Sequence, residues 1–61
     1  MDNADLVNRL VEAASREYNK LSWISDKKRR FKQAVRTAFR RLKAPWRLQG
    51  AVCRELGKRA H

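Results

Sequence analysis

The chain has 61 residues and a formal net charge of +10, from 16 Lys and Arg residues against 6 Asp and Glu residues. Its 43% hydrophobic content argues against plain disorder, which needs high net charge together with low hydrophobicity. No apolar run approaches the roughly 20 residues of a membrane span, and the length allows one small domain at most.

Residues 3–20 have the pattern of an amphipathic structural helix. Apolar residues recur there every three or four positions, so they form one stripe of the helix. On the outer side we expect ion pairs between Asp5 and Arg9 and between Glu12 and Arg16, because each acid precedes its base by four residues. The apolar stripe includes Leu6, Leu10 and Tyr18.

The segment 21–25 interrupts this pattern and predicts a turn between two helices. Ser22 or Ser25 can cap the helix that follows, with Asp26 in its first turn. We expect Trp23 to fold under the turn and close the core at that end, rather than to serve as a contact residue.

Residues 26–43 predict a second amphipathic helix. Its apolar positions follow the spacing i, i+3, i+4, i+7, i+8, i+11 without interruption, which forms one continuous buried stripe. Ala44-Pro45 ends the helix, because proline disfavours helical geometry in the residue before it. The stripe consists of Phe31, Ala34, Val35, Ala38, Phe39 and Leu42.

Residues 45–56 predict a shorter third helix. Pro45 suits its first turn, since proline has no N–H to satisfy there. Gly57 is the expected C-terminal cap, and we expect the basic tail, 57–61, to be frayed. The apolar side of this helix consists of Leu48, Ala51, Val52 and Leu56.

These elements predict a single all-α domain, 1–61, in which a shorter third helix joins an antiparallel helical hairpin. A core this small usually needs a further source of stability. Cys53 is the only cysteine, which excludes an internal disulfide, and one His with one Cys cannot complete a structural metal site. We therefore expect a homodimeric helical bundle without cofactor or metal. Core or dimer contacts are predicted for Leu6, Leu10, Tyr18, Trp23, Phe31, Val35, Phe39 and Leu42.

Cationic side chains gather on the outer side of the second predicted helix. At about 100° per residue, five of them project away from the apolar stripe. No acidic residue follows Asp26 in this helix, although a solvated surface usually mixes both signs. Aligned like charges destabilise a helix by roughly 0.2–0.5 kcal/mol per pair, so we expect an anionic partner. The five residues are Arg29, Lys32, Arg36, Arg40 and Lys43.

This arrangement predicts contact with nucleic-acid phosphates. From Arg29 to Lys43 the cations would span about 21 Å, which suits crossing a duplex groove. Ten of the 16 basic residues are arginine, whose planar guanidinium binds phosphate through paired hydrogen bonds. Supporting contacts are predicted for Arg30, Arg41, Arg47 and Arg54.

We expect duplex RNA or DNA as the partner, with little sequence specificity. Beside the arginines, base readout would need Asn or Gln on the contact face as well, and only Gln33 and Gln49 are near it. Single-strand binders interleave aromatic and basic side chains so that bases can stack, whereas only Trp46 is available here. The organisation is similar to that of several small dimeric viral silencing suppressors, which lay a basic helix across double-stranded RNA. That analogy is one of architecture, without a family motif, and suits a viral, phage or plasmid accessory protein.

Three other interpretations stay open. The basic side can dock on an acidic host protein as an effector, or on an anionic membrane surface as a basic amphipathic helix. The membrane interpretation is disfavoured, because two further helices offer the apolar stripe a partner within the protein. A helix-turn-helix would instead use the third helix for reading, with Arg47 and Gln49 near the bases.

Catalysis has little support in the sequence. His61 is the last residue, Cys53 has no orienting His on the same helix, and the acids of the first predicted helix form no paired-carboxylate arrangement. We therefore expect a protein that is not an enzyme. The N-terminus lacks a signal-peptide pattern, so the expected location is the cytoplasm. The nucleus is the alternative in a eukaryotic host, where Lys27-Lys28-Arg29-Arg30 would pass as a localisation signal.

Overall fold

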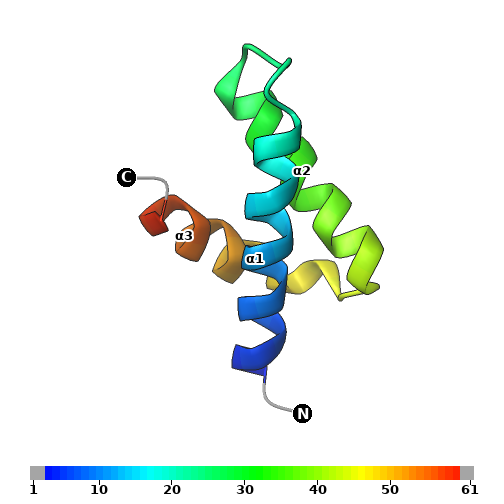
Figure 1. The fold of residues 1–61 in the computed structure, drawn as a ribbon. Coiled ribbons are helices and arrows are strands. Elements are labelled where there is room, and N and C mark those ends of the chain that lie inside the picture. Colours follow the sequence, from blue (N-terminus) through cyan, green and yellow to red (C-terminus); the bar gives the residue numbers. More distant parts are fainter. Residues whose placement is uncertain (1–2, 60–61) are drawn as a thin grey trace.

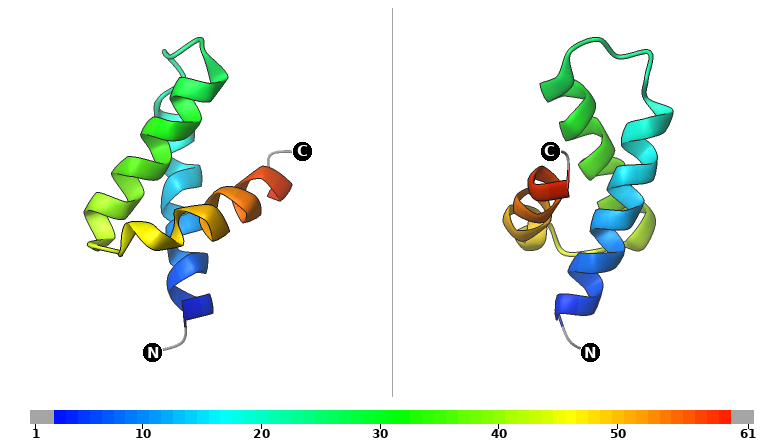
Figure 2. Two further views of the ribbon diagram at one scale, coloured as in Figure 1. Left: turned by 180° about the vertical axis from the view of Figure 1, so that it is seen from behind. Right: turned by 60° about the vertical axis from the view of Figure 1, so that its left-hand side comes forward.

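The computed structural model describes residues 3–59. This part of the chain forms α1 (Asn3–Lys20), α2 (Lys27–Leu42), the 3₁₀ turn η1 (Trp46–Leu48) and α3 (Gln49–Arg59). Helices α1 and α2 form a hairpin, and α3 lies across α1 at a steep angle (Figure 1, Figure 2). The predicted all-α hairpin with a shorter third helix is confirmed. None of the described helices combines the length and apolar content that crossing a membrane requires.

The core lies where the three helices meet. Ala14 of α1 and Ala38 of α2 are fully buried, and such small side chains let two helices approach closely. Helix α3 packs mainly against α1, so α1 contacts both of the other helices. The buried apolar residues are Leu10, Val11, Ala14, Ala34, Val35, Ala38, Phe39, Val52 and Leu56.

Helix α2 begins one residue later than predicted, because Asp26 is its N-cap. Asp26 has extended backbone angles (φ −78°, ψ 109°), and its Oδ1 accepts from the backbone N–H groups of Lys28 at 3.0 Å and Arg29 at 3.5 Å. The predicted cap at Ser22 or Ser25 is wrong. A carboxylate at this end also offsets the unfavourable position of several cations at a helix N-terminus.

A Schellman motif ends α2. Lys43 has left-handed backbone angles (φ 50°, ψ 40°); its N–H donates to the carbonyl of Arg40 at 3.3 Å, and the N–H of Ala44 donates to the carbonyl of Phe39 at 3.1 Å. Glycine usually occupies the left-handed position. The end of the helix before Pro45 is confirmed, and lysine at the left-handed position is a feature that the sequence pattern did not indicate.

The third predicted helix, 45–56, is divided and extends further than expected. Pro45 is extended (φ −68°, ψ 131°) and precedes η1, rather than lying in a first helical turn. Helix α3 continues through Gly57 to Arg59, so the predicted cap at Gly57 and fraying of 57–59 are wrong. The rest of the predicted tail, 60–61, lies outside the described residues.

Trp23 and Leu42 do not belong to the core of the chain. The exposed fraction is 77% for Trp23 and 40% for Leu42, so their predicted burial is wrong, and dimer contacts for them stay a prediction. Leu21 and Ile24 of the same connection are half-buried, whereas the indole of Trp23 faces solvent. Leu6, Tyr18 and Phe31 are half-buried at the edge of the core, and Leu10, Val35 and Phe39 are buried as predicted.

Substitutions at Leu10 and Trp23 should show that the first residue belongs to the core and the second to the surface. Leu10→Ala should lower the free energy of unfolding by about 2–5 kcal/mol, because it leaves a cavity at a fully buried position. Trp23→Ala should change it by less than about 0.5 kcal/mol, as at other exposed positions. Urea denaturation followed by circular dichroism measures both. A loss at Trp23 equal to that at Leu10 would contradict the exposed position of the indole.

Candidate nucleic-acid interface

The five cations predicted as phosphate contacts are all exposed, and together they are called the α2 basic row: Arg29, Lys32, Arg36, Arg40 and Lys43. At about 100° per residue, the four that lie within α2 fall within about 80° of one another, on the side away from Ala34 and Ala38. Lys32 borders the buried Phe39, which follows it by seven positions. The structure shows no ion pair between any of the five and another residue in the range 3–59. The row is therefore an exposed set of cations without carboxylate partners in that range.

Lys43 differs from the other members of the α2 basic row. It is the left-handed residue beyond the helix end, so the helical period does not set the direction of its side chain. A left-handed conformation costs a non-glycine residue roughly 1–2 kcal/mol, of which a cation near a helix C-terminus recovers about 0.3–1 kcal/mol. The helical part of the row, Arg29 to Arg40, rises about 17 Å, which is shorter than the sequence predicts.

Two of the predicted supporting cations contact α1 instead of standing free. The Nε of Arg30 donates to the carbonyl of Tyr18 at 2.7 Å, and the Arg30 guanidinium lies 3.9 Å from the centroid of the Tyr18 ring. The Nη1 of Arg41 lies 3.1 Å from Oε1 of Glu17, whose side chain is only 10% exposed. Arg30 and Arg41 therefore join α2 to α1, a role that the periodicity of one helix cannot reveal.

Fewer charged side chains on the exterior of α1 form ion pairs than predicted. The structure contains neither the Asp5–Arg9 nor the Glu12–Arg16 ion pair, since the ion pairs of residues 3–59 lie elsewhere. Arg9 and Arg16 are exposed and lie on a different helix from the α2 basic row. They therefore form a matched pair of exposed arginines for comparison with that row.

The remaining predicted supporting residues, Arg47 in η1 and Arg54 in α3, are exposed. Arg54 lines a shallow hollow together with Val7 and Asn8 of α1. It lies beside the first half of α1, and Arg47 lies in the connection that precedes α3. Their support for a surface centred on α2 stays a prediction.

Trp46 lies beside the α2 basic row, as the sequence suggested. Its ring packs edge-on against Phe39, with ring centroids 4.8 Å apart and planes 68° apart, and 47% of the residue remains exposed. It lines a groove of about 340 Å³ to which Lys32 and Arg36 contribute from α2 and Cys53 from α3.

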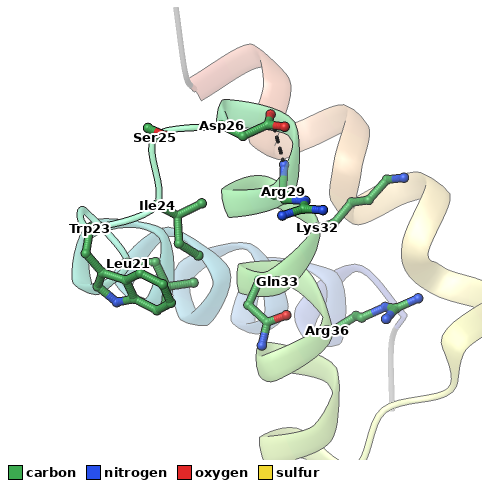
Figure 3. A pocket seen from close by; sticks show the side chains of 9 residues that line it. All are labelled: Leu21, Trp23, Ile24, Ser25, Asp26, Arg29, Lys32, Gln33 and Arg36. Carbon is green, nitrogen blue, oxygen red and sulfur yellow. Dashed lines mark hydrogen bonds between the residues drawn. The ribbon is translucent and has the colours of Figure 1, made fainter.

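Trp23 lies beside the same row in a second hollow, of about 670 Å³ (Figure 3). Leu21, Trp23 and Ile24 line it from the connection between α1 and α2, and Arg29, Lys32, Gln33 and Arg36 line it from α2. The sequence prediction missed this second exposed aromatic because it assigned Trp23 to the core. The available signal was the turn itself: Ser22 and Ser25 mark a connection between two helices, and such connections usually run over the protein surface.

Cys53 is half-buried in the groove beside Trp46, and its thiol is free. Burial raises the pKa of the Cys53 thiol above its ordinary value, so the thiol is protonated at neutral pH and is a weak nucleophile. No group of three or more His, Cys, Asp or Glu residues that could hold a metal ion exists within residues 3–59. His61, which the sequence analysis considered, lies outside that range.

The alkylation rate of Cys53 should reveal this effect of burial on its pKa. Iodoacetamide should react more slowly with the folded protein at neutral pH than with the same chain in urea, because the thiolate is the reacting form. The pH at which the rate is half-maximal should lie higher for the folded chain. An equal or lower half-maximal pH would contradict burial of the thiol.

Comparison with known proteins found no relative of this chain. No protein-family model, no curated protein and no solved structure matches the chain. Function is therefore inferred from the chain's own residues. The α2 basic row and the two exposed tryptophans beside it are the features from which that inference starts.

Proposed function

We propose that the protein binds duplex RNA or DNA by placing the α2 basic row against backbone phosphates. The observation that carries the proposal is the exposure of five cations along one short segment, none of them ion-paired with residues 3–59. Helix α2 is held against the rest of the chain through its buried residues Ala34, Val35, Ala38 and Phe39. The cations are thus attached to a helix whose rotation is fixed before a partner arrives.

Charge neutralisation would supply most of the affinity. Each neutralised phosphate of a duplex releases counterions, and log K falls with log salt by about 0.9 per contact. Five contacts would give a slope of about 4.5. Such binding depends little on sequence, because phosphates are the same at every step.

Sequence readout has few candidate residues on this surface. Gln33 lines the Trp23 hollow, and Gln49 lines the groove beside Trp46, so each lies at an edge of the α2 basic row. Base-specific binding usually needs several paired contacts to base edges. The proposal therefore includes little sequence preference.

Two other partners are compatible with the charge but less well supported. A membrane-surface helix needs a free apolar face, whereas the apolar residues in the middle of α2 are buried in the core. An acidic protein would satisfy the same cations. Arginine at three of the five positions favours phosphate, whose oxygens match the guanidinium geometry. The proposed activity is binding rather than catalysis, and it suits the cytoplasm or, in a eukaryotic host, the nucleus.

Removing two arginines from the middle of the row tests the proposal. Arg36→Ala/Arg40→Ala should weaken duplex binding and reduce the salt slope by about 2, one unit per lost contact. Between about 50 and about 200 mM salt, the variant's affinity should fall about tenfold less than that of the unchanged protein. Gel-shift titrations with matched duplex RNA and DNA measure both quantities.

The control variant Arg9→Ala/Arg16→Ala removes the same net charge from the exposed side of α1. It should change the salt slope much less, because these arginines are not part of the row. Equal effects of the two variants would show that only net charge matters, and intact binding by Arg36→Ala/Arg40→Ala would show that α2 is not the contact surface. Arg47→Ala/Arg54→Ala tests in the same assay whether η1 and α3 supply the contact surface instead, as a helix-turn-helix would.

We propose further that the protein acts as a homodimer. Two features support a dimer: the small core of a short chain, and Leu42 at the end of α2, which is 40% exposed. Sedimentation equilibrium should give twice the chain mass, and Leu42→Lys should shift the protein toward the monomer. A single species of monomer mass at all concentrations would contradict the dimer.

A further inference from the structure

Trp23 is more exposed than the other large hydrophobic residues in the range 3–59 that face solvent: 77%, against 47% for Trp46 and 40% for Leu42. Its backbone is nevertheless held. The N–H of Leu21 donates to the carbonyl of Glu17 at 3.0 Å, and the N–H of Ile24 donates to the carbonyl of Leu21 at 3.0 Å. The indole is therefore presented by a short hydrogen-bonded turn.

The indole shares its hollow with three members of the α2 basic row. Arg29, Lys32 and Arg36 line the hollow together with Trp23. In the view of Figure 3, Gln33 lies between the indole of Trp23 and the guanidinium of Arg36. An aromatic face, an amide and the side chains of three unpaired cations thus line one open space, and the charged ends of Lys32 and Arg36 point away from the indole (Figure 3).

This combination matches the chemistry of an unpaired nucleotide. A base stacks on an aromatic side chain while cations hold the adjoining phosphates, and the amide of Gln33 offers both donors and an acceptor to a base edge. A base inside a duplex is covered on both faces by its neighbours. Only a base that has left the duplex, or extends beyond it, can lie flat against Trp23.

We propose that the Trp23 hollow binds an unpaired base adjoining a duplex that the α2 basic row holds, so that the preferred ligand is a duplex with a single-stranded extension. This inference rests on the proposed function and narrows its substrate class. It also revises the sequence-based preference for a plain duplex, which assumed that Trp46 was the only exposed aromatic near the row.

Other occupants of the hollow are less compatible with its surroundings. A second copy of the chain would bring two cationic rows together, and their repulsion opposes that contact. A lipid surface would meet one exposed tryptophan, since Leu21 and Ile24 are half-buried and the apolar side of α2 faces the core. An extended nucleic acid satisfies the indole and the cations at once.

The first test compares two ligands: a blunt duplex, and the same duplex with a short unpaired extension, each made as RNA and as DNA. The protein should prefer the extended ligand, and Trp23→Ala should lower that preference at least about fivefold, the lower limit for loss of one base–aromatic stack. Trp23→Phe should keep most of the preference, because it retains an aromatic face. A preference that is absent, or unchanged in Trp23→Ala, overturns the inference.

The second test uses the fluorescence of Trp23 itself. Trp46→Phe leaves Trp23 as the only tryptophan and keeps an aromatic ring against Phe39. The extended ligand should quench the emission of this variant more than the blunt duplex does. Equal quenching by both ligands, or a shift produced by anionic vesicles alone, overturns the inference.

Failure of this inference can be distinguished from failure of the proposed function. If Arg36→Ala/Arg40→Ala weakens blunt-duplex binding while Trp23→Ala leaves the ligand preference unchanged, the proposed function stands and the unpaired-base site is wrong. If the unchanged protein binds neither ligand, both are wrong.

Discussion

The rotation of α2 about its own axis is the constraint on which the rest of the surface depends. Ala34, Val35, Ala38 and Phe39 are buried against the rest of the chain, and Arg30 and Arg41 bind α1 from one flank of the helix. A step of one residue turns a helix by about 100°, which would carry members of the α2 basic row toward the core. Burying them there without partners would cost several kcal/mol per charge. The apolar stripe and the two arginine contacts therefore fix the exposed side together.

The cations of the chain divide between these structural contacts and the free surface. Glu17 is nearly buried and lies 3.1 Å from Arg41 and 3.8 Å from Lys20, so this carboxylate of α1 offsets charge on the hairpin. Asp26 caps the N-terminus of α2, where its carboxylate accepts hydrogen bonds from backbone N–H groups. Neither acid forms an ion pair with the α2 basic row. Five of the 16 basic residues of the chain thus form an exposed row that can raise the rate of encounter with a polyanion.

The sequence predicted the features that the helical period of each segment determines. It missed the features that depend on contacts with other elements of the fold. The limits of α1 and the two sides of α2 follow from apolar residues at three- and four-residue spacing. The roles of Arg30 and Arg41 depend on which part of α1 faces them, and a single-helix pattern holds no such information. Trp23 was misplaced because its burial depends on how the connection between α1 and α2 folds, which the pattern of neither helix determines. Gly57 did not end α3, because it does not adopt the left-handed backbone angles of a C-terminal cap and the helix continues to Arg59.

The two ends of the α2 basic row are chemically unlike, which gives the surface a direction. Trp23 lies near the Arg29 end, just before the Asp26 cap, and the left-handed Lys43 lies at the other end. Trp46 flanks the row beside Lys32 and Arg36 from a different side. A uniform row of charges would bind a phosphate backbone equally well in either orientation. With the proposed stacking on Trp23, the orientation that brings unpaired bases to the Arg29 end is favoured, because the reversed orientation keeps the phosphate contacts but loses that stack. The proposed stack would thus orient a ligand without reading its sequence.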